Sequence, residues 1–382
     1  MEEWKEYRLG EICESVSESY RGKAEKVVLI NTSDVLEGEC LNHSKVPNKE
    51  LKGQFKKTFK ENDILYSEIR PVNRRYAYID FFAKDYIAST KLMVLRHNEK
   101  VLPKYLYYIL QSKDMIEELQ MLAEARSGTF PQITFDVLSK ECVMIPNINT
   151  QEKILAILTS LDNKIQLNRK INSNLEEQAK ALYSKYASLA IGTARIGDLA
   201  NEVLDYTPCT YPRVYLLNSS DISEGIFPKI ELVDNKDLKG HFKKRFRFGD
   251  ILYSQIRPRN HHYGLVLFEA DRYISSTRLM IIRTKKEQIS EYLLYQAIIS
   301  PCVCDEFTLK TETRSGTFPQ GNYKDMANII IPYGTKEQRE KIEPKLKVLR
   351  EAIYSYQKEN VILSSIRDAL LPKLMSGEIE VK

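Results

Sequence analysis

The sequence predicts an α+β protein made of two duplicated, mixed α/β domains, each followed by a long helix. The first observation is a repeat, because DILYSEIRP, from Asp63 to Pro71, returns with one change as DILYSQIRP, from Asp250 to Pro258. The second is a heptad pattern of apolar residues after each copy, which is typical of long paired helices. The third is length, because 382 residues exceed one typical domain.

The repeat extends through most of the chain. LKGQFKKTFKENDILYSEIRP, which begins at Leu51, matches LKGHFKKRFRFGDILYSQIRP, which begins at Leu238, at 15 of 21 positions. The loop sequence RSGTFPQ also occurs in both copies. A unit of nearly half the chain is far longer than a solenoid repeat of 20–50 residues, so it indicates a duplicated domain. We expect domains at 1–149 and 192–334, and long helices at 150–191 and 335–382.

Each globular part has the pattern of a mixed α/β domain. The β-rich stretches YIASTKLMVLR, from Tyr86, and YISSTRLMIIR, from Tyr273, predict buried strands. The segment 103–125 is amphipathic and begins with a proline, so it predicts one helix. The residues SGT and PQ that follow predict a loop before the next element.

The segments after the globular parts predict helices of about 40 residues, or about 60 Å. The second contains Pro344 in its first turns, where a proline is least harmful. The natural partner of each helix is its duplicate, and Asn168 and Asn172 in the seam would fix the register. A helix that packs only on its own domain is the alternative. The apolar seam residues are Ile154, Leu158, Leu161, Ile165, Leu175, Leu182, Ile342, Leu346, Leu349, Ile353, Leu363 and Leu370.

Composition and charge restrict the classes of function. Lys and Arg outnumber Asp and Glu by 57 to 52, and this net charge of +5 is weak support for a nucleic-acid ligand. No apolar run reaches the ~18 residues of a membrane span, and the first residues do not resemble a signal peptide, so we expect a cytoplasmic protein. The six cysteines are scattered without a CxxC motif, and we expect reduced thiols and no metal site.

The sequence lacks the common motifs of catalysis. It contains no GxGxxG, GxxxxGK[ST], HExxH or GxSxG stretch, and no Asn/Asp-Pro-Pro-aromatic loop of the kind that holds a flipped base. His261 and His262 are neighbours, but the first copy has two arginines there, which argues against a catalytic base. Asp63 and Asp250 precede apolar strands and are interpreted as turn residues. We predict no catalytic residue.

Basic and polar residues recur instead in motifs that suit nucleic acid. Lysines precede each DILYS stretch and could neutralise phosphates, with solvated turns as the alternative. RPVNRRY and RPRNHHY end a strand in Arg-Pro and continue into a loop, where arginine could contact guanine and asparagine could contact adenine. Lys91 and Arg278 follow the ST of their strands. The RSGTFPQ loop offers polar donors, with a glycine turn that ends a helix as its alternative.

These motifs give one set of candidate DNA-binding residues in each copy. The first set is Lys56, Lys57, Arg70, Asn73, Arg74, Arg75, Lys91, Arg126, Ser127, Thr129 and Gln132. The second set is Lys243, Lys244, Arg257, Arg259, Asn260, His261, His262, Arg278, Arg314, Ser315, Thr317 and Gln320.

The chain resembles a specificity subunit of a Type I restriction–modification system over nearly its whole length. The resemblance depends on two globular parts that are each followed by a long helix, and on four local sequences. These are GTFPQI from Gly128, IPNINTQEKILAIL from Ile145, IPYGTKEQREKI from Ile331 and LLPKLMSGEIEV from Leu370. The four stretches together are specific, whereas any one alone would be weak.

The resemblance implies that the chain itself is not an enzyme. In that family, each globular part is a target-recognition domain that reads one part of a split DNA site in the major groove. The two helices pack as an antiparallel coiled coil that sets the gap between the half-sites. Two modification (methyltransferase) subunits supply the S-adenosylmethionine chemistry, and restriction subunits add ATP-dependent cleavage. The implied partners are double-stranded DNA and these subunits, and no cofactor is implied for this chain.

The chain departs from many family members because its two halves are close relatives. Two similar domains in an approximate two-fold arrangement predict a nearly palindromic split target. The half-sites should differ at one or a few base pairs. Two other functions stay open, namely a stand-alone DNA adenine methyltransferase and a coiled-coil scaffold without a DNA role. The loop positions that differ between the copies are Val72/Arg259, Arg74/His261, Arg75/His262 and Lys91/Arg278.

Overall fold

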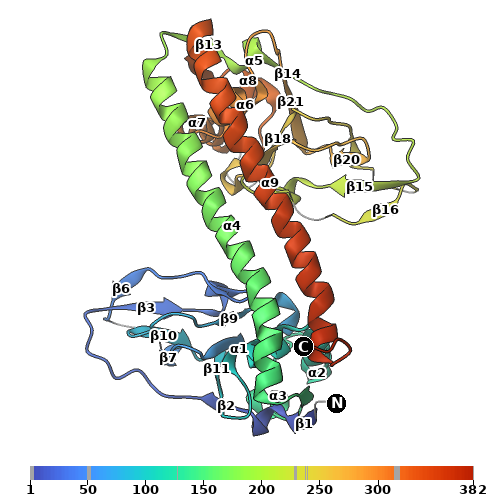
Figure 1. Ribbon diagram of the computed structural model, residues 1–382. Helices are drawn as coiled ribbons and strands as arrows, with labels where there is room; N and C mark the ends of the chain where they lie inside the picture. The colour runs from blue at the N-terminus through green and yellow to red at the C-terminus, as the bar shows by residue number, and fades with distance from the viewer. Residues whose placement is uncertain are drawn as a thin grey trace. The chain divides into compact units, whose positions relative to one another are not determined.

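The computed structural model describes residues 4–49, 53–126, 128–227, 230–236, 238, 240–313 and 319–381. The chain divides into two compact units, of which unit 1 comprises residues 1–163 and 364–382, and unit 2 comprises residues 164–363. Each unit contains one copy of the repeat. The long helices α4 (Ile148–Leu189) and α9 (Lys336–Met375) each contribute residues to both units (Figure 1).

Unit 1 contains two four-stranded sheets, with the strand orders β2-β11-β8-β9 and β6-β3-β10-β7. β3 and β10 run parallel, and the other pairs in these sheets are antiparallel. Two short pairs, β1-β12 and β4-β5, complete the unit. The strands are β1 (Lys5–Arg8), β2 (Cys13–Val16), β3 (Lys26–Ile30), β4 (Val35–Leu36), β5 (Glu39–Cys40), β6 (Lys45–Pro47), β7 (Phe55–Lys57), β8 (Ile64–Ser67), β9 (Tyr76–Tyr78), β10 (Tyr86–Ser89), β11 (Leu92–His97) and β12 (Cys142–Ile145).

Unit 2 has the same two sheets, with the orders β14-β21-β18-β19 and β16-β15-β20-β17, and the short pair β13-β22. β15 and β20 form the equivalent parallel pair. This shared topology confirms a duplicated mixed α/β domain. The strands are β13 (Gly192–Arg195), β14 (Ala200–Glu202), β15 (Arg213–Leu217), β16 (Leu232–Asp234), β17 (Phe242–Lys244), β18 (Ile251–Ser254), β19 (Tyr263–Leu265), β20 (Tyr273–Ser276), β21 (Leu279–Thr284) and β22 (Ile330–Tyr333).

Short helices complete both units, and the helix expected at 103–125 is two helices. Ser112 separates them because its backbone is extended, and its hydroxyl accepts a hydrogen bond from the Met115 N–H at 3.3 Å. None of the described helices is both long and apolar enough to cross a membrane. The short helices are α1 (Pro103–Gln111), α2 (Lys113–Arg126), α3 (Phe135–Leu138), α5 (Ile196–Leu199), α6 (Glu291–Ile298), α7 (Pro301–Glu312) and α8 (Tyr323–Ala327).

The stretch that begins at Tyr86 also divides, into β10 and β11. These strands belong to different sheets, so the turn at Thr90 and Lys91 passes from one sheet to the other. β20 and β21 repeat this arrangement, with Thr277 and Arg278 in the turn. The turn places Lys91 and Arg278 at the ends of strands rather than inside them.

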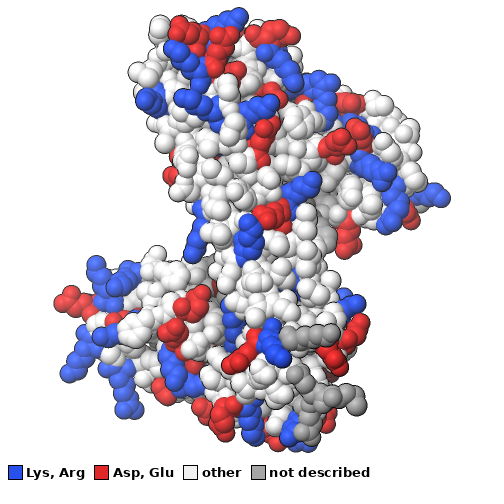
Figure 2. All heavy atoms as spheres, viewed as in Figure 1, with Lys and Arg blue, Asp and Glu red and all other residues white. Residues whose placement is uncertain are grey.

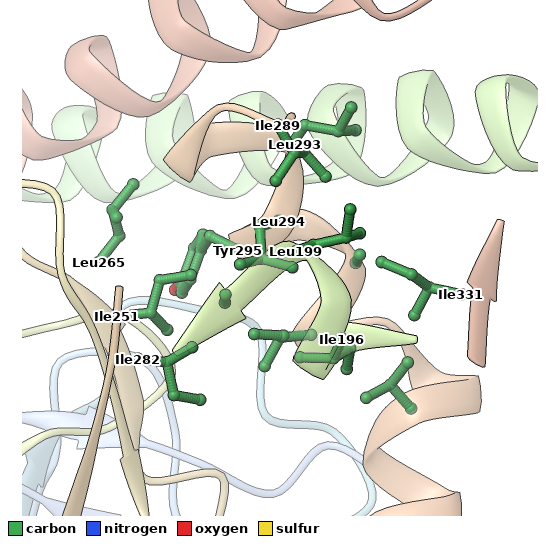
Figure 3. Packing of buried hydrophobic residues seen from close by; sticks show 14 of the residues in the cluster. Ile196, Leu199, Ile251, Leu265, Ile282, Ile289, Leu293, Leu294, Tyr295 and Ile331 are labelled. Atoms are coloured by element: carbon green, nitrogen blue, oxygen red, sulfur yellow. The ribbon is translucent and has the colours of Figure 1, made fainter. Parts of the chain in front are cut away.

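Strand β8 lies at the centre of unit 1 because both of its faces are buried. Ile64 and Tyr66 pack in the core that contains α1 and α2, whereas Leu65 packs in the core between the two sheets. β18 alternates in the same way in unit 2, and Figure 3 shows Ile251 in one of its cores with Leu294 of α6. Burial on both faces explains the uninterrupted apolar run in each DILYS stretch.

Helices α4 and α9 lie side by side and antiparallel (Figure 1). In unit 2, Asn168 Nδ2 donates to Glu359 Oε2 at 2.7 Å and to Asn360 Oδ1 at 2.9 Å. Near the opposite end of this contact, Gln338 Nε2 donates to the Leu189 carbonyl at 2.8 Å. Since residue numbers rise along α4 where they fall along α9, these contacts agree with the antiparallel pair that the resemblance implied.

The apolar seam residues divide between the helix pair and the domain cores. Ile154 and Leu158 pack in the core of unit 1, and Ile342 and Leu346 pack in the core of unit 2. The pairing of the helices and the packing of each helix on its own domain, which the sequence presented as alternatives, therefore occur together. The other buried seam residues are Ile165 and Ile353, and the half-buried ones are Leu161, Leu175, Leu182, Leu349, Leu363 and Leu370.

Candidate nucleic-acid interface

Four motifs that are distant in sequence meet along one hydrogen-bonded ladder in the first domain. The Thr90 N–H donates to the Gln54 carbonyl at 2.7 Å, and the Glu68 N–H donates to the Lys91 carbonyl at 3.0 Å. The Ile133 N–H in turn donates to the Glu68 carbonyl at 2.8 Å. We call residues 54–57, 67–75, 89–91 and 131–133 the loop edge of the first domain. The loop edge brings the lysine, Arg-Pro, ST and PQ motifs together.

The second domain forms the same ladder. The Thr277 N–H donates to the His241 carbonyl at 2.8 Å, and the Gln255 N–H donates to the Arg278 carbonyl at 2.9 Å. The Gly321 N–H donates to the Gln255 carbonyl at 2.8 Å. Residues 241–244, 254–262, 276–278 and 319–321 are therefore the loop edge of the second domain. Because the backbone scaffold is the same, the two edges differ in their side chains.

The Arg-Pro turn at each loop edge has a backbone of unusual conformation. Arg70 has a φ of 44° and Arg74 a φ of 51°, and the equivalent residues Arg257 and His261 have φ values of 46° and 54°. Non-glycine residues in this left-handed region carry strain, and such strain is concentrated at functional sites. The turn exposes Asn73 at its apex.

The structure exposes most of the candidate residues but not all of them. Ser127, Arg314, Ser315 and Thr317 lie outside the described residues. Arg75, Gln132, His261, His262 and Lys57 are half-buried, and Lys244 is buried. The exposed candidates are Lys56, Arg70, Asn73, Arg74, Lys91, Arg126, Thr129, Lys243, Arg257, Arg259, Asn260, Arg278 and Gln320.

Lys57 and Lys244 point into the protein. The Lys57 Nζ donates to the Leu92 carbonyl at 2.8 Å, and the Lys244 Nζ donates to the Leu279 carbonyl at 2.9 Å. Burial lowers the pKa of both amines. Their place in the structure argues against the phosphate contact expected for them and indicates that they hold the loop edge to β11 and β21.

Arg75 and His262, which differ between the copies, share one structural role. Arg75 Nη1 donates to the Val35 carbonyl at 3.4 Å, and His262 Nδ1 donates to the carbonyl of the equivalent residue, Ile222, at 2.6 Å. Both side chains therefore fasten the Arg-Pro turn to the body of the domain. This geometry argues against a role for either residue in distinguishing one half-site from the other.

An ion pair with a buried carboxylate lies in each domain at the end of β8 or β18 opposite the loop edge, and the sequence did not reveal it. Asp63, which is 1% exposed, accepts hydrogen bonds from Arg96 Nε and Nη2 at 2.8 Å each. Its carboxylate also accepts from the Lys60 N–H at 2.9 Å, so the turn interpretation of Asp63 is compatible with this pair. Asp250 and Arg283 repeat the arrangement. The recurrence of an arginine at the ends of YIASTKLMVLR and YISSTRLMIIR is the signal that could have revealed it.

Basic side chains also gather near the loop edge of the first domain. Figure 2 shows Lys and Arg side chains clustered over the part of the first domain that carries β3, β6 and β7, where Lys26, Lys45 and Lys56 are exposed. β7 itself forms part of the loop edge. Cationic groups on a fixed scaffold suit the phosphates of DNA.

Comparison with known proteins identifies the type of domain. Residues 1–177 match the family model described as "Type I restriction modification DNA specificity domain". The chain is 49% identical over 189 residues to the Type I restriction enzyme HindI specificity subunit of Haemophilus influenzae, and this match covers 49% of the chain and 41% of that protein. It is 23% identical over 316 residues to the MjaIX specificity subunit of Methanocaldococcus jannaschii, which covers 74% of the chain and 70% of that protein.

A solved structure has the same fold. The S subunit of the Type I restriction–modification system from M. genitalium matches with a TM-score of 0.58 and 16% identity, over 98% of this chain and 96% of that chain. The match to the DNA specificity domain falls on residues 1–177, and the internal repeat gives the second half the same topology. The chain is therefore similar in sequence to Type I specificity subunits and shares its fold with one of them. These relatives support neither a stand-alone methyltransferase nor a coiled-coil scaffold.

Adjacent lysines on β7 give a matched pair of variants that tests the exposed side of the loop edge. We expect Lys56→Ala to lower the salt dependence of DNA binding by about one phosphate contact and to leave thermal stability unchanged. We expect Lys57→Ala to lower stability by about 1–3 kcal/mol, because it leaves the buried carbonyl of Leu92 without its donor. Binding isotherms at several salt concentrations and thermal melts distinguish the two. The reverse pattern would contradict the orientation of β7.

Proposed function

We propose that the chain is the DNA-recognition subunit of a Type I restriction–modification complex. In this proposal, the chain acts in the cytoplasm, recognises a bipartite and nearly palindromic site, and directs methyltransferase and restriction subunits to that site. The observation that supports the proposal is the loop edge, where Arg, Asn and Lys side chains from four motifs meet on the same scaffold in each domain. Arg, Lys and Asn are the residues that read purine edges in the major groove.

The chemistry belongs to the partners in this proposal. Two modification subunits would use S-adenosylmethionine, and restriction subunits would use ATP. The described residues contain no cluster of three or more His, Cys, Asp or Glu placed to hold a metal. The continuous helices α4 and α9 would set the gap between the half-sites, because each contributes residues to both units.

The two asparagines at the apex of the Arg-Pro turns provide the test. Asn73→Ala in the complex with the methyltransferase subunits should relax the base preference at one position of one half-site, with a loss of about tenfold in discrimination, because an asparagine contact to adenine is removed. Asn260→Ala should do the same at the corresponding position of the other half-site. Methylation rates on duplexes with single base changes measure both effects.

The exposed Glu117→Ala on α2 is the control, and its preferences should equal those of the unchanged protein. Loss of activity on all sequences without a change in base preference would indicate that the asparagines contact phosphates. Unchanged methylation of every duplex in both asparagine variants would exclude the loop edge as the DNA-reading surface.

A further inference from the structure

The single change within the nine-residue repeat, Glu68 in place of Gln255, alters the charge of the loop edge. In the first domain, Glu68 Oε2 lies 3.6 Å from Lys91 Nζ. The same Nζ donates to Gln132 Oε1 at 3.3 Å. Lys91 is therefore partly neutralised and is held by two side chains of its own domain.

The second domain lacks this restraint. Gln255 occupies the position of Glu68 and carries no charge, and Arg278 occupies the position of Lys91. Arg278 is exposed, and within the described part of the second domain its guanidinium has no ion-pair or hydrogen-bond partner. Both differences favour a contact between this side chain and a DNA base. Gln255 removes the carboxylate that would hold the cation, and arginine supplies a planar guanidinium whose donors have fixed positions.

The second domain has a carboxylate near its inward-pointing lysine as well, but this carboxylate lies on a different strand from that of Glu68. Lys244 Nζ lies 3.8 Å from Glu202 Oε1, on β14. Glu202 pairs with β21 at the same register at which Ser15 pairs with β11 in the first domain. The inward-pointing lysine of each domain, Lys57 or Lys244, therefore has one nearby carboxylate, which is Glu68 in the first domain and Glu202 in the second. Glu202 offsets the positive charge of Lys244, as Glu68 does for Lys57. Because position 255 is an uncharged glutamine, the turn that carries Arg278 has no carboxylate there.

We infer that the position of this carboxylate determines a difference between the two half-sites. The free Arg278 donates to O6 and N7 of a guanine in the second half-site, whereas Lys91, held by Glu68 and Gln132, makes no such contact at the equivalent pair of the first. Arginine binds guanine through two parallel hydrogen bonds, which a restrained lysine does not reproduce. The second half-site therefore requires a G·C pair at a position where the first does not. This inference rests on the proposed function.

A triple variant tests the inference while it preserves the buried lysine. Ser15→Glu, Glu68→Gln and Lys91→Arg together give the first domain the charge arrangement of the second. In the complex with its methyltransferase subunits, this variant should gain a preference for guanine at one position of the first half-site. The expected gain is about 5- to 150-fold in methylation rate over the other bases, and the second half-site should not change. The reverse variant, Glu202→Ser, Gln255→Glu and Arg278→Lys, should lose the guanine preference in the second half-site.

The outcomes separate this inference from the proposed function. If the unchanged complex methylates a split site and both triple variants keep its base preferences, the function stands and the role of Arg278 is excluded. If the unchanged complex has no sequence preference, the proposed function fails first. Thermal melts show whether each variant folds. If one triple variant is unfolded, the single variant Arg278→Ala gives the same decision, because it keeps every carboxylate, removes the donors to guanine and should lose the guanine preference.

Discussion

Asp63→Ala is expected to lower the free energy of unfolding of the first domain by about 3 kcal/mol. The substitution removes the carboxylate that Arg96 contacts through two hydrogen bonds and leaves a half-buried guanidinium with one distant partner, Glu18 at 3.7 Å. It also removes the acceptor of the Lys60 N–H, which closes the turn before β8. Denaturant unfolding followed by far-ultraviolet circular dichroism measures the change.

A matched control comes from an exposed ion pair of the same domain. Glu117 lies 3.7 Å from Lys113 on the surface of α2, and both side chains are more than half exposed. Glu117→Ala should change stability by less than about 0.5 kcal/mol. Asp250→Ala should reproduce the effect of Asp63→Ala in the second domain. A loss below about 1 kcal/mol in both aspartate variants would contradict a structural role for the buried pairs.

Arg350→Glu is expected to separate α4 from α9 in unit 2. Arg350 is 4% exposed, and its Nη1 donates to Glu176 Oε1 at 2.5 Å, while its Nη2 contacts Gln296 of α6. The substitution would bury a second carboxylate against Glu176, with an expected loss of about 3–5 kcal/mol. Denaturant unfolding measures this loss. Lys347→Ala, on the exposed face of the same helix, should have little effect.

A charge exchange tests the register of the helix pair. If Glu176 and Arg350 face each other, the double variant Glu176→Arg and Arg350→Glu should recover about half or more of the stability that Arg350→Glu loses. Additive losses in the double variant would show that the two side chains do not interact. Recovery through a different partner on α4 would show that the register is shifted.

Much of the fold is predictable because the chain contains it twice. A stretch that recurs at 15 of 21 positions must build the same strands, and the two units have the same sheet orders. The breaks at Ser112 and at the turn after Ser89 were missed, because each depends on a local capping bond or a change of sheet that apolar periodicity does not reveal. Helix α9 begins at Lys336 and continues through Pro344.

The candidate site is predictable as a set of motifs but not as a set of orientations. The sequence places Lys56 and Lys57 side by side, yet alternate residues of a strand face opposite sides, so one is exposed and the other turns inward. Arg75 resembles a DNA contact in sequence and fastens a turn in the structure. The charged layer formed by Glu176 and Arg350 was missed because the seam was predicted from apolar residues and two asparagines, without charged residues.

The most direct test of DNA recognition is a map of methylated bases in the host genome, with the gene for this chain intact and with it deleted, in the presence of the co-expressed methyltransferase subunits. We expect one split, nearly palindromic motif to lose its methylation on deletion. Loss of a clearly asymmetric split motif would retain the recognition role and contradict the symmetry inferred from the duplication. An identical methylation map in both strains would contradict the proposal that this chain selects the sites.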